Sequence, residues 1–262
     1  MAESDERRSE ILTLIDLKGE ATLAELCGRF SGVSELTIRR DLIQLEQEGR
    51  IIRTRGGAVS IRSLGDSRSW HGQSGEENEY MLRAGSNREA KDIIARKALR
   101  FVEKGRSIYF DAGSTVMALA RIVPDETMTI ITNGVNVAEE LAPRHNITVM
   151  VPGGTVNRNT LSVSGPISVN FVDNINIELA FMSASGCSVD AGFTVSNIYE
   201  AELKHTVVSR ARTVIMLLDS SKFDKSLLFT LAELGQVNYL VCECEPPEDI
   251  AEACRALGVE IV

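Results

Sequence analysis

Hydrophobic residues in the first sixty positions recur at helical spacing in three separate stretches. The third stretch begins at Ser34 and ends at Gly49, and its apolar residues Ile38, Leu42 and Leu45 follow the spacing i, i+4, i+7. Serine accepts hydrogen bonds at the start of a helix, and glycine takes the left-handed conformation that ends one. The pattern therefore predicts one helix between these two residues.

Two further helices are predicted before it. Residues 5–18 carry apolar side chains on one face, and Thr22 and Glu25 have the spacing of a capping box for the next helix. The tripeptide Ser31–Val33 has glycine at its centre and predicts a tight turn before Ser34. Helix, short turn and helix is the order of a helix-turn-helix unit.

The face of the third helix opposite its apolar stripe is polar. An advance of about 100° per residue places Arg40 nearly opposite the stripe, with Thr37 and Gln44 nearby. Arginine pairs with guanine or phosphate, glutamine with adenine and threonine with either, so we interpret this face as a DNA-reading surface. A solvated face on which Glu35 and Arg39 form an i,i+4 ion pair is the alternative that this helix alone leaves open. The candidate DNA-binding residues are Ser34, Thr37, Arg39, Arg40 and Gln44, followed by Arg53 and Arg55 in the next segment.

That next segment has the pattern of a hairpin. Two β-prone runs, residues 51–54 and 58–61, flank the glycines Gly56 and Gly57. The whole chain has a net charge of −9, which seen alone argues against nucleic acid. Between Arg39 and Arg62, however, six arginines stand against three acidic residues. Positive charge thus gathers on the proposed reading helix and the hairpin, where contacts to phosphates are expected.

An ordered string of motifs runs through this region. It comprises Glu6-Arg7-Arg8, Gly19, Val33-Ser34-x-x-Thr37-Ile38-Arg39-Arg40-Asp41-Leu42-x-x-Leu45-Glu46-x-x-Gly49 and Ile52-Arg53-x-x-Gly56-Gly57-Ala58. The string closely resembles the N-terminal domain of DeoR-family transcriptional regulators. The resemblance implies that residues 1–61 form a winged helix-turn-helix domain that binds a double-stranded DNA operator. It also implies that Ser34 to Leu45 is the recognition helix and that Arg53 and Arg55 belong to the wing.

The rest of the chain has a different pattern. Residues 62–88 are rich in serine and glycine and show no period, so we expect an inter-domain linker. A helix is predicted over residues 89–103, and short apolar strands then alternate with helices. Such alternation is typical of a largely parallel sheet covered on both faces, so residues 89–262 are expected to form one Rossmann-like α/β domain. The strands are expected within residues 107–115, 129–133, 147–154, 179–186, 213–219 and 238–242.

Small or polar residues follow these strands, at the edge of an open α/β sheet where ligands bind. A helix begins at Gly113-Ser114-Thr115, so its free amides and its dipole can hold a phosphate, and Lys222 supplies a cation at another strand end. Asp111, Asn133 and Glu200 are candidates for binding sugar hydroxyls. Each residue taken singly fits an ordinary turn or cap, but five such strand ends together favour a ligand crevice.

Further motifs extend over this second part. They are Asp111-Ala-Gly-Ser-Thr115, Thr132-Asn133, Gly153-Gly154, Gly186, Gly192, Glu200-Ala-x-x-Lys204 and Asp219-Ser-Ser-Lys222-Phe223. They look like the DeoR effector domain, which is similar in fold to ribose-5-phosphate isomerases and senses phosphorylated sugars or related intermediates. The resemblance adds Thr132 and Lys204 to the effector site. The chain departs from the commoner Asp-Ser-Gly-Thr-Thr pattern at Ala112, and from the usual strand-Thr-Asp pattern at Tyr239-Leu-Val-Cys-Glu243.

A sugar-phosphate isomerase-like enzyme carrying a DNA-binding domain is the alternative function. Isomerisation needs a carboxylate base and a cation that polarises the carbonyl, and Glu200 with Lys204 or Lys222 has that chemistry. The Asp-Gly-Ala-Asp-Glu string typical of the isomerases is absent, however, and Ser183-Ala-Ser-Gly-Cys-Ser-Val stands at the comparable strand end. We therefore expect a transcriptional regulator rather than an enzyme: a repressor of a carbohydrate-utilisation operon, controlled by a phosphorylated sugar.

Partners and location complete the sequence-based picture. The N-terminus is charged and no apolar run approaches the roughly 20 residues that span a bilayer, so we expect a cytoplasmic protein without membrane contact. His71, His145 and His205 lie far apart and lack ligand spacing, so no metal or other cofactor is expected. One recognition helix covers only a few base pairs, which favours a homodimer or homotetramer.

Overall fold

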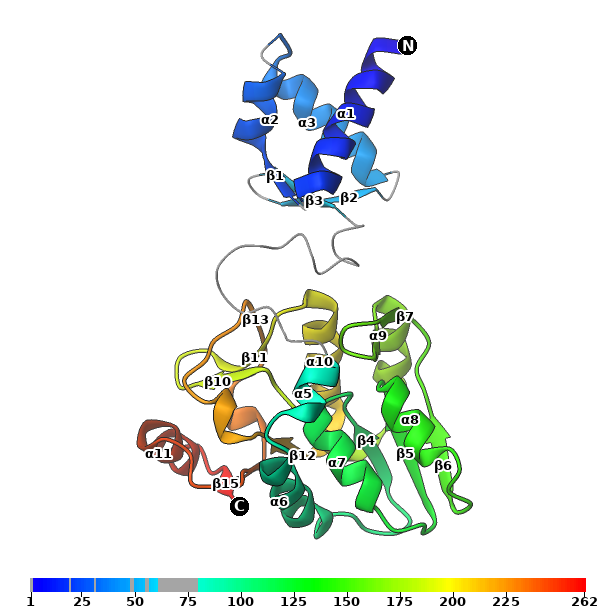
Figure 1. Cartoon of the computed structure of the whole chain (residues 1–262), viewed down its shortest axis with the longest axis vertical. Helices are drawn as coiled ribbons and strands as arrows, with labels where there is room; N and C mark the ends of the chain where they lie inside the picture. Colours follow the sequence, from blue (N-terminus) through cyan, green and yellow to red (C-terminus); the bar gives the residue numbers. More distant parts are fainter. Residues whose placement is uncertain (1, 19, 31, 48–49, 55–56, 61–79) are drawn as a thin grey trace. The chain divides into compact units, whose positions relative to one another are not determined.

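The computed structural model describes residues 2–18, 20–30, 32–47, 50–54, 57–60 and 80–262 (Figure 1). The chain divides into two compact units, Met1–Glu76 and Glu77–Val262. In the part of the chain that the structure describes, no helix is long and apolar enough to cross a membrane. Several residues of the sequence predictions, namely Gly19, Gly49, Arg55, Gly56 and His71, lie outside the described residues.

The first unit holds three helices and a small antiparallel sheet. The Thr22 hydroxyl accepts from the amide of Glu25 at 3.2 Å, and the Glu25 carboxylate accepts from the amide of Thr22 at 2.9 Å, which confirms the predicted capping box. Ser34 caps the third helix by accepting from the amide of Thr37 at 3.2 Å. The helices are α1 (Ala2–Lys18), α2 (Leu23–Arg29) and α3 (Glu35–Gln47), and the strands in sheet order are β1 (Glu20–Thr22), β3 (Gly57–Ser60) and β2 (Ile51–Thr54).

Strand β1 is absent from the sequence prediction. Three residues are too few to show a period, and Thr22 already carries the signal of a helix cap. The strand pairs with β3 so tightly that a Cβ at Gly57 would lie 2.1 Å from the carbonyl oxygen of Ala21. Glycine is therefore required at this point of the wing, and β1 ties the wing to the helices.

The apolar stripe predicted on the third helix is buried. Ile38 is 0% exposed and Leu42 and Leu45 are each 3% exposed, and they pack with Ile11 and Ile15 of α1 in one core. This burial fixes which side of α3 faces solvent.

A buried ion pair joins α1 to α3. Arg7 Nε donates to Asp41 Oδ2 at 2.6 Å and its Nη2 donates to Oδ1 at 3.3 Å, while Arg8 Nη1 lies 4.0 Å from Oδ1. The Asp41 side chain is 5% exposed and that of Arg7 is 18% exposed. Two-point contact between a guanidinium and a carboxylate fixes orientation as well as distance. The acidic residue inside the predicted recognition helix therefore anchors that helix to α1.

The second unit is built on seven parallel strands; the sequence predicts a largely parallel sheet and six of these strands, but not the short strand at residues 260–261. The strands in sheet order are β15 (Glu260–Ile261), β14 (Tyr239–Val241), β12 (Ala211–Leu217), β9 (Ile177–Met182), β4 (Ser107–Phe110), β5 (Met128–Thr132) and β6 (Ile147–Met150). Because all run in the same direction, the carboxyl ends of β12, β9, β4 and β5 are successive neighbours along one edge of the sheet.

Helices cover both faces of this sheet (Figure 1). Strand β4 shows the alternation: Ile108 and Phe110 belong to the core on one face, and Tyr109 between them belongs to the core on the other. The first face is covered by α6 (Arg88–Leu99), α7 (Ser114–Ile122) and α8 (Val135–Leu141), and the second by α9 (Pro166–Asp173), α10 (Ile198–Arg210) and α11 (Glu248–Ala256).

Part of the predicted linker is helical. Helix α5 (Tyr80–Gly85) and the first residue of α6 fall within residues 62–88. Tyr80 is 6% exposed and its amide donates to the carbonyl of Asn159 at 2.7 Å, so tertiary contacts hold a segment whose composition shows no period. The sequence also failed to predict short strands and turns, because three or four residues leave little periodic signal: β7 (Thr155–Asn157) with β8 (Ser162–Ser164), β10 (Gly186–Ser188) with β11 (Gly192–Val195) and β13 (Phe229–Ala232), and the 3₁₀ turns η1 (Ser220–Lys222) and η2 (Leu234–Gln236).

We expect Asp41→Asn to destabilise the first unit by about 1–3 kcal/mol, because the half-buried Arg7 guanidinium loses its carboxylate. Hydrogen–deuterium exchange of α1 and α3 amides measures this as faster exchange. Glu35→Gln is the control: it removes the exposed Glu35–Arg39 pair, which contributes about 0.5 kcal/mol or less. Equal loss of protection in the two variants would contradict the anchoring role of Asp41.

Candidate functional site

The outer face of α3 carries the predicted DNA-binding side chains. Arg40 is exposed, and Thr37 and Gln44 are half-buried on its flank. Arg39 is exposed and lies 2.8 Å from the Glu35 carboxylate, so the ion pair considered as the alternative does form. Arg53 belongs to β2, and Arg55 lies outside the described residues. The face carries the polar residues expected from the sequence together with two exposed apolar side chains, Leu36 and Ile43, and the DNA contacts of its residues stay predictions.

In the second unit a single lysine binds two carboxylates in the interior. Lys204 Nζ lies 2.9 Å from Asp111 Oδ2, 2.9 Å from Glu200 Oε1 and 2.8 Å from the carbonyl oxygen of Ser183. The side chains of Lys204, Asp111 and Glu200 are 3%, 0% and 8% exposed. The cation is thus surrounded by acceptors, and the buried group carries one net negative charge.

Local structure explains why these residues meet. Glu200 and Lys204 are four positions apart on α10 and so project from the same side of the helix. Asp111 follows β4 directly, in phase with Tyr109, which faces the α10 side of the sheet. The amide and hydroxyl of Ser183, at the end of β9, both donate to Asp111 Oδ2. The group therefore links β4, β9 and α10.

Two buried oxygens beside this group accept no hydrogen bond from any described residue: Asp111 Oδ1 and Asn133 Oδ1. Phe110 pairs with Thr132 in the β4–β5 register, so the next residues, Asp111 and Asn133, stand on neighbouring strand ends. Asn133 uses its amide nitrogen to donate to the carbonyl of Val163 at 3.3 Å. A buried acceptor without a donor is costly, so these two atoms mark where a ligand donor would be favourable.

Tyr109 adds a buried hydroxyl to the same region. Burial raises the pKa of its phenol well above the usual value, and the negative charges of Asp111 and Glu200 raise it further. The hydroxyl keeps its proton and has no hydrogen-bond partner among the described residues.

The start of α7 lies against these groups. Gly113 is the N-cap and Ser114 the first helical residue, and no side chain caps the helix. A Cβ at Gly113 would lie 2.1 Å from Ser183 Oγ and 3.6 Å from Asp111 Oδ2, so only glycine fits without movement of Ser183. Ser114 is half-buried and Thr115 is 5% exposed. Backbone amides at an uncapped helix start favour a negatively charged group.

The Thr132 side chain has a structural role in the strand-end turn rather than a free hydroxyl for a ligand. Its hydroxyl accepts a hydrogen bond from the amide of Gly134 at 3.0 Å and is completely buried. This is the ordinary turn-forming role that the sequence analysis kept open for such residues.

Lys222 belongs to a second polar group, at the end of β12. Burial alone would raise the pKa of the Asp219 carboxyl, but hydrogen bonds from Ser221 and Asn87 and the charges of Lys222 and Lys91 bring it below its usual value. Burial lowers the pKa of the Lys91 ammonium, and the positive charges of Lys222 and Arg83 act in the same direction, against Asp219.

The structure thus separates the predicted effector residues into two groups. Asp111, Glu200 and Lys204 are in contact, with the start of α7 beside Asp111, whereas Lys222 follows β12, two strands away from β4. Strand spacing puts these two strand ends about 10 Å apart.

Other residues of these groups were not predicted as site residues. Ser183 and Asp219 stand at strand ends that the sequence marks as polar, so that signal was available. Lys91 gives no such signal, because only the fold shows that it is 5% exposed and that its ammonium donates to the carbonyl of Ser86 at 2.7 Å.

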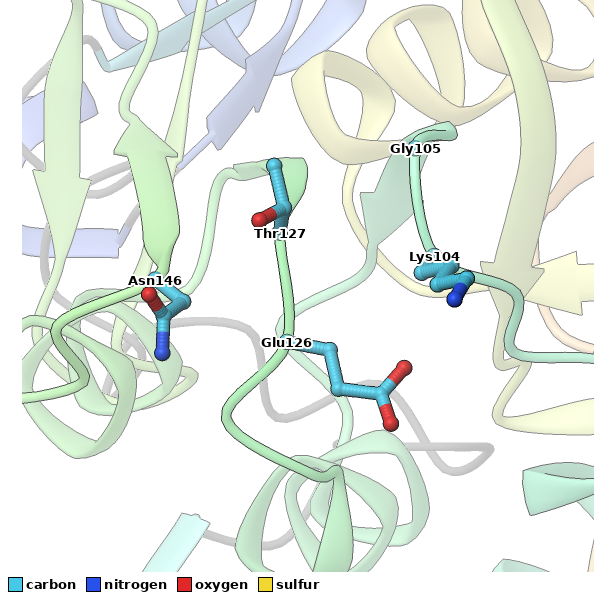
Figure 2. A pocket seen from close by; sticks show the side chains of 5 residues that line it. All are labelled: Lys104, Gly105, Glu126, Thr127 and Asn146. Atoms are coloured by element: carbon cyan, nitrogen blue, oxygen red, sulfur yellow. The ribbon is translucent and has the colours of Figure 1, made fainter.

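A shallow hollow lies at the opposite edge of the sheet. Figure 2 shows its lining residues, which precede the amino ends of β4, β5 and β6: Lys104, Gly105, Glu126, Thr127 and Asn146. Ligands of open α/β sheets bind at the carboxyl ends of the strands, so this hollow lies on the wrong edge for the expected effector crevice.

We expect Lys204→Met to destabilise the second unit by about 3–5 kcal/mol, because two buried carboxylates lose their shared cation. Thermal unfolding followed by circular dichroism measures the loss. Lys104→Met removes an exposed lysine of the same unit and should change its stability by about 0.5 kcal/mol or less. A Lys204→Met protein as stable as this control would show that the buried ion pairs contribute little.

Comparison with known proteins accounts for both units. Residues 7–64 match the DeoR-like helix-turn-helix domain, and residues 86–243 match the DeoR C terminal sensor domain. The HTH-type transcriptional regulator GolR of Listeria innocua is 37% identical, over 91% of this chain and 90% of that protein. GlpR of Haloferax volcanii, another HTH-type transcriptional regulator, is 32% identical over 98% of this chain and 96% of that protein.

Solved structures overlap with the chain in part. Ribose 5-phosphate isomerase A from Methanocaldococcus jannaschii matches with a TM-score of 0.39 and 18% identity, over 53% of this chain and 55% of that one. The translation initiation factor eIF-2B of Pyrococcus horikoshii OT3 matches with a TM-score of 0.45 and 17% identity, over 62% of this chain and 66% of that one. The two domain matches and the full-length relatives show that the chain belongs to the DeoR family of DNA-binding transcriptional regulators and is not an isomerase.

Proposed function

We propose that this regulator represses a carbohydrate-utilisation operon and that a phosphorylated sugar controls its binding to the operator. The observation that carries the proposal is the pair of buried acceptors, Asp111 Oδ1 and Asn133 Oδ1, at adjacent strand ends of the sensor domain. A putative repressor of the aga operon in Escherichia coli O157:H7 is 28% identical over 99% of this chain, and an L-fucose operon activator of Haemophilus influenzae is 31% identical over 94% of it, so these relatives support control of a carbohydrate operon but do not favour repression over activation.

Hydroxyl groups are the ligand chemistry that suits these acceptors. An O–H donor satisfies a buried oxygen without bringing a second charge into a group that is already negative. Lys204 holds Asp111 from the other side, so its role is to orient the carboxylate rather than to contact the ligand. Both acceptors are closed to solvent, so ligand entry requires the neighbouring loops to move.

The phosphate is assigned to the start of α7, at Gly113, Ser114 and Thr115, with Lys222 as the balancing cation. Three positive side chains, Lys222, Lys91 and Arg83, stand against the carboxylates of Asp219 and Glu243 at the end of β12, and Glu243 is held by the amide of Ser220 at 2.9 Å. The end of β12 is therefore positive and the Asp111 end is negative. Because the start of α7 lies beside Asp111, a phosphate held there by the helix amides also needs the positive charge of Lys222 to offset the Asp111 carboxylate.

Catalysis is less well supported than sensing. An isomerase needs a base that reaches the substrate carbon and a cation that reaches its carbonyl. Here Lys204 already contacts two carboxylates and one backbone carbonyl, so the same ion pairs occupy the cation and the candidate bases.

Operator recognition is assigned to α3 and the wing. We place Arg40, Thr37 and Gln44 against base edges in the major groove, and Ser34, Arg39, Arg53 and Arg55 against the backbone. A homodimer or homotetramer, held by the sensor domains, would present paired recognition helices to repeated half-sites.

We expect Lys222→Ala to keep full operator affinity but to weaken effector binding by about tenfold or more, because a charged partner of the phosphate is lost. Isothermal calorimetry against a panel of pentose and hexose phosphates, with the best ligand then added to operator titrations, measures both properties. Lys225→Ala is the matched control, since Lys225 is an exposed lysine three positions away. Effector affinity that is equal in the two variants would place the phosphate elsewhere.

The two groups of arginines should differ in their response to salt and sequence. Arg40→Ala should cost about 1–3 kcal/mol of operator binding and relax base preference at one position. Arg53→Ala should weaken binding to all sequences alike and reduce the salt slope by about one unit. Fluorescence anisotropy at several salt concentrations separates these effects, with the exposed Arg212 of the sensor domain changed to alanine as the control. Unchanged operator affinity in the Arg40→Ala protein would contradict the placement of this face of α3 in the major groove.

A further inference from the structure

Two large apolar side chains are exposed on the recognition helix. Leu36 is 59% exposed and Ile43 is 37% exposed, and within the described residues of the first unit no other large apolar side chain is exposed to this degree. Every other predicted feature of α3 assigns its outer face to polar contacts. Leu36 does not pack into the core of the unit, so its exposure at this position requires a separate explanation.

Helical geometry places Leu36 at the centre of the outer face. At about 100° per residue, Ile43 falls within about 20° of Leu36 and Arg40 within about 40°. The buried residues Ile38 and Leu45 fall about 160–180° away, on the opposite side. Leu36 is also the second residue of α3, in the turn that Ser34 caps.

The surroundings of Leu36 specify what covers it. Two exposed arginines, Arg39 and Arg40, follow it on the same helix, so the face is complementary to a polyanion rather than to an apolar protein surface. The N-terminal residues of a recognition helix contact base edges in the major groove. The apolar group that the major groove displays is the C5-methyl group of thymine.

We propose that Leu36 contacts the C5-methyl group of a thymine in the operator and so selects thymine at that position. The inference rests on the placement of α3 in the major groove that is proposed above. It gives the operator one base whose recognition is apolar, beside the contacts assigned to Arg40.

The test uses full-length protein and DNA that differs by one methyl group. Binding sites are first selected from random-sequence duplexes with the wild-type protein. Each thymine of a selected site is then replaced in turn by uracil, which lacks only the methyl group. For the wild type we expect one position per half-site at which uracil weakens binding about three- to fivefold, the effect of one buried methyl group. The Leu36→Ala protein should bind thymine and uracil equally there, with an unchanged salt slope.

Leu228→Ala is the matched control, because Leu228 is also 59% exposed but belongs to the sensor domain. It should keep the wild-type preference for thymine. A uracil penalty that persists in Leu36→Ala, or a wild type without any such penalty, overturns the inference. Arg40→Ala distinguishes the two proposals: if its operator affinity is unchanged, the placement of α3 in the groove fails. If Arg40→Ala loses affinity while Leu36→Ala keeps the uracil penalty, only the role of Leu36 fails.

Discussion

The sensor domain depends on one buried cation. Charges are costly to bury, and Lys204 is 3% exposed between two carboxylates that are themselves buried. The two carboxylates are tolerable inside the protein only because Lys204 lies between them, and removing that lysine leaves two buried negative charges without compensation. The contact therefore fixes Asp111 at the end of β4, Ser183 at the end of β9 and the first turns of α10 in one arrangement.

In the proposed function, this constraint is also the route by which a ligand acts on the domain. One oxygen of Asp111 is held by Lys204 and Ser183, and the other accepts nothing from the described residues. A ligand hydroxyl that donates to the second oxygen would therefore bind a carboxylate that is already in contact with β9 and α10 and that follows β4. A ligand shifts the DNA-bound equilibrium only if it binds the two arrangements of these segments with different affinities. A typical coupling of about 1–3 kcal/mol changes operator affinity by roughly 5–150-fold.

The sequence predicted the parts of the fold that carry long periodic signals. The stripe of Ile38, Leu42 and Leu45, the capping box at Thr22 and the parallel strands of the sensor domain are all present. Helix α5 was missed because its stability comes from Tyr80 in the core, which a local pattern does not show. In the candidate site, too, local patterns predicted the positions of residues but not their tertiary contacts. Strand ends located Asp111 and Asn133, but the partner of each side chain depends on which elements the fold brings together.

Each unit holds one charged side chain in its interior by an ion pair, a carboxylate in the first unit and a lysine in the second. In the first unit, Asp41 lies on the helix that carries Arg39 and Arg40, and its negative charge would oppose DNA if it faced outward. Asp41 instead lies on the inner side, 5% exposed, where it pairs with Arg7, joins α3 to α1 and leaves the outer face positive. In the second unit, Lys204 is turned inward against two carboxylates, so the neighbouring acceptors, one carboxylate oxygen of Asp111 and the amide oxygen of Asn133, suit hydroxyl groups rather than phosphate. In both units a buried ion pair orients the element that is expected to contact the ligand. The charge that this pairing does not neutralise then determines which ligand group suits the neighbouring side chains: DNA phosphates at α3, and hydroxyl groups beside Lys204.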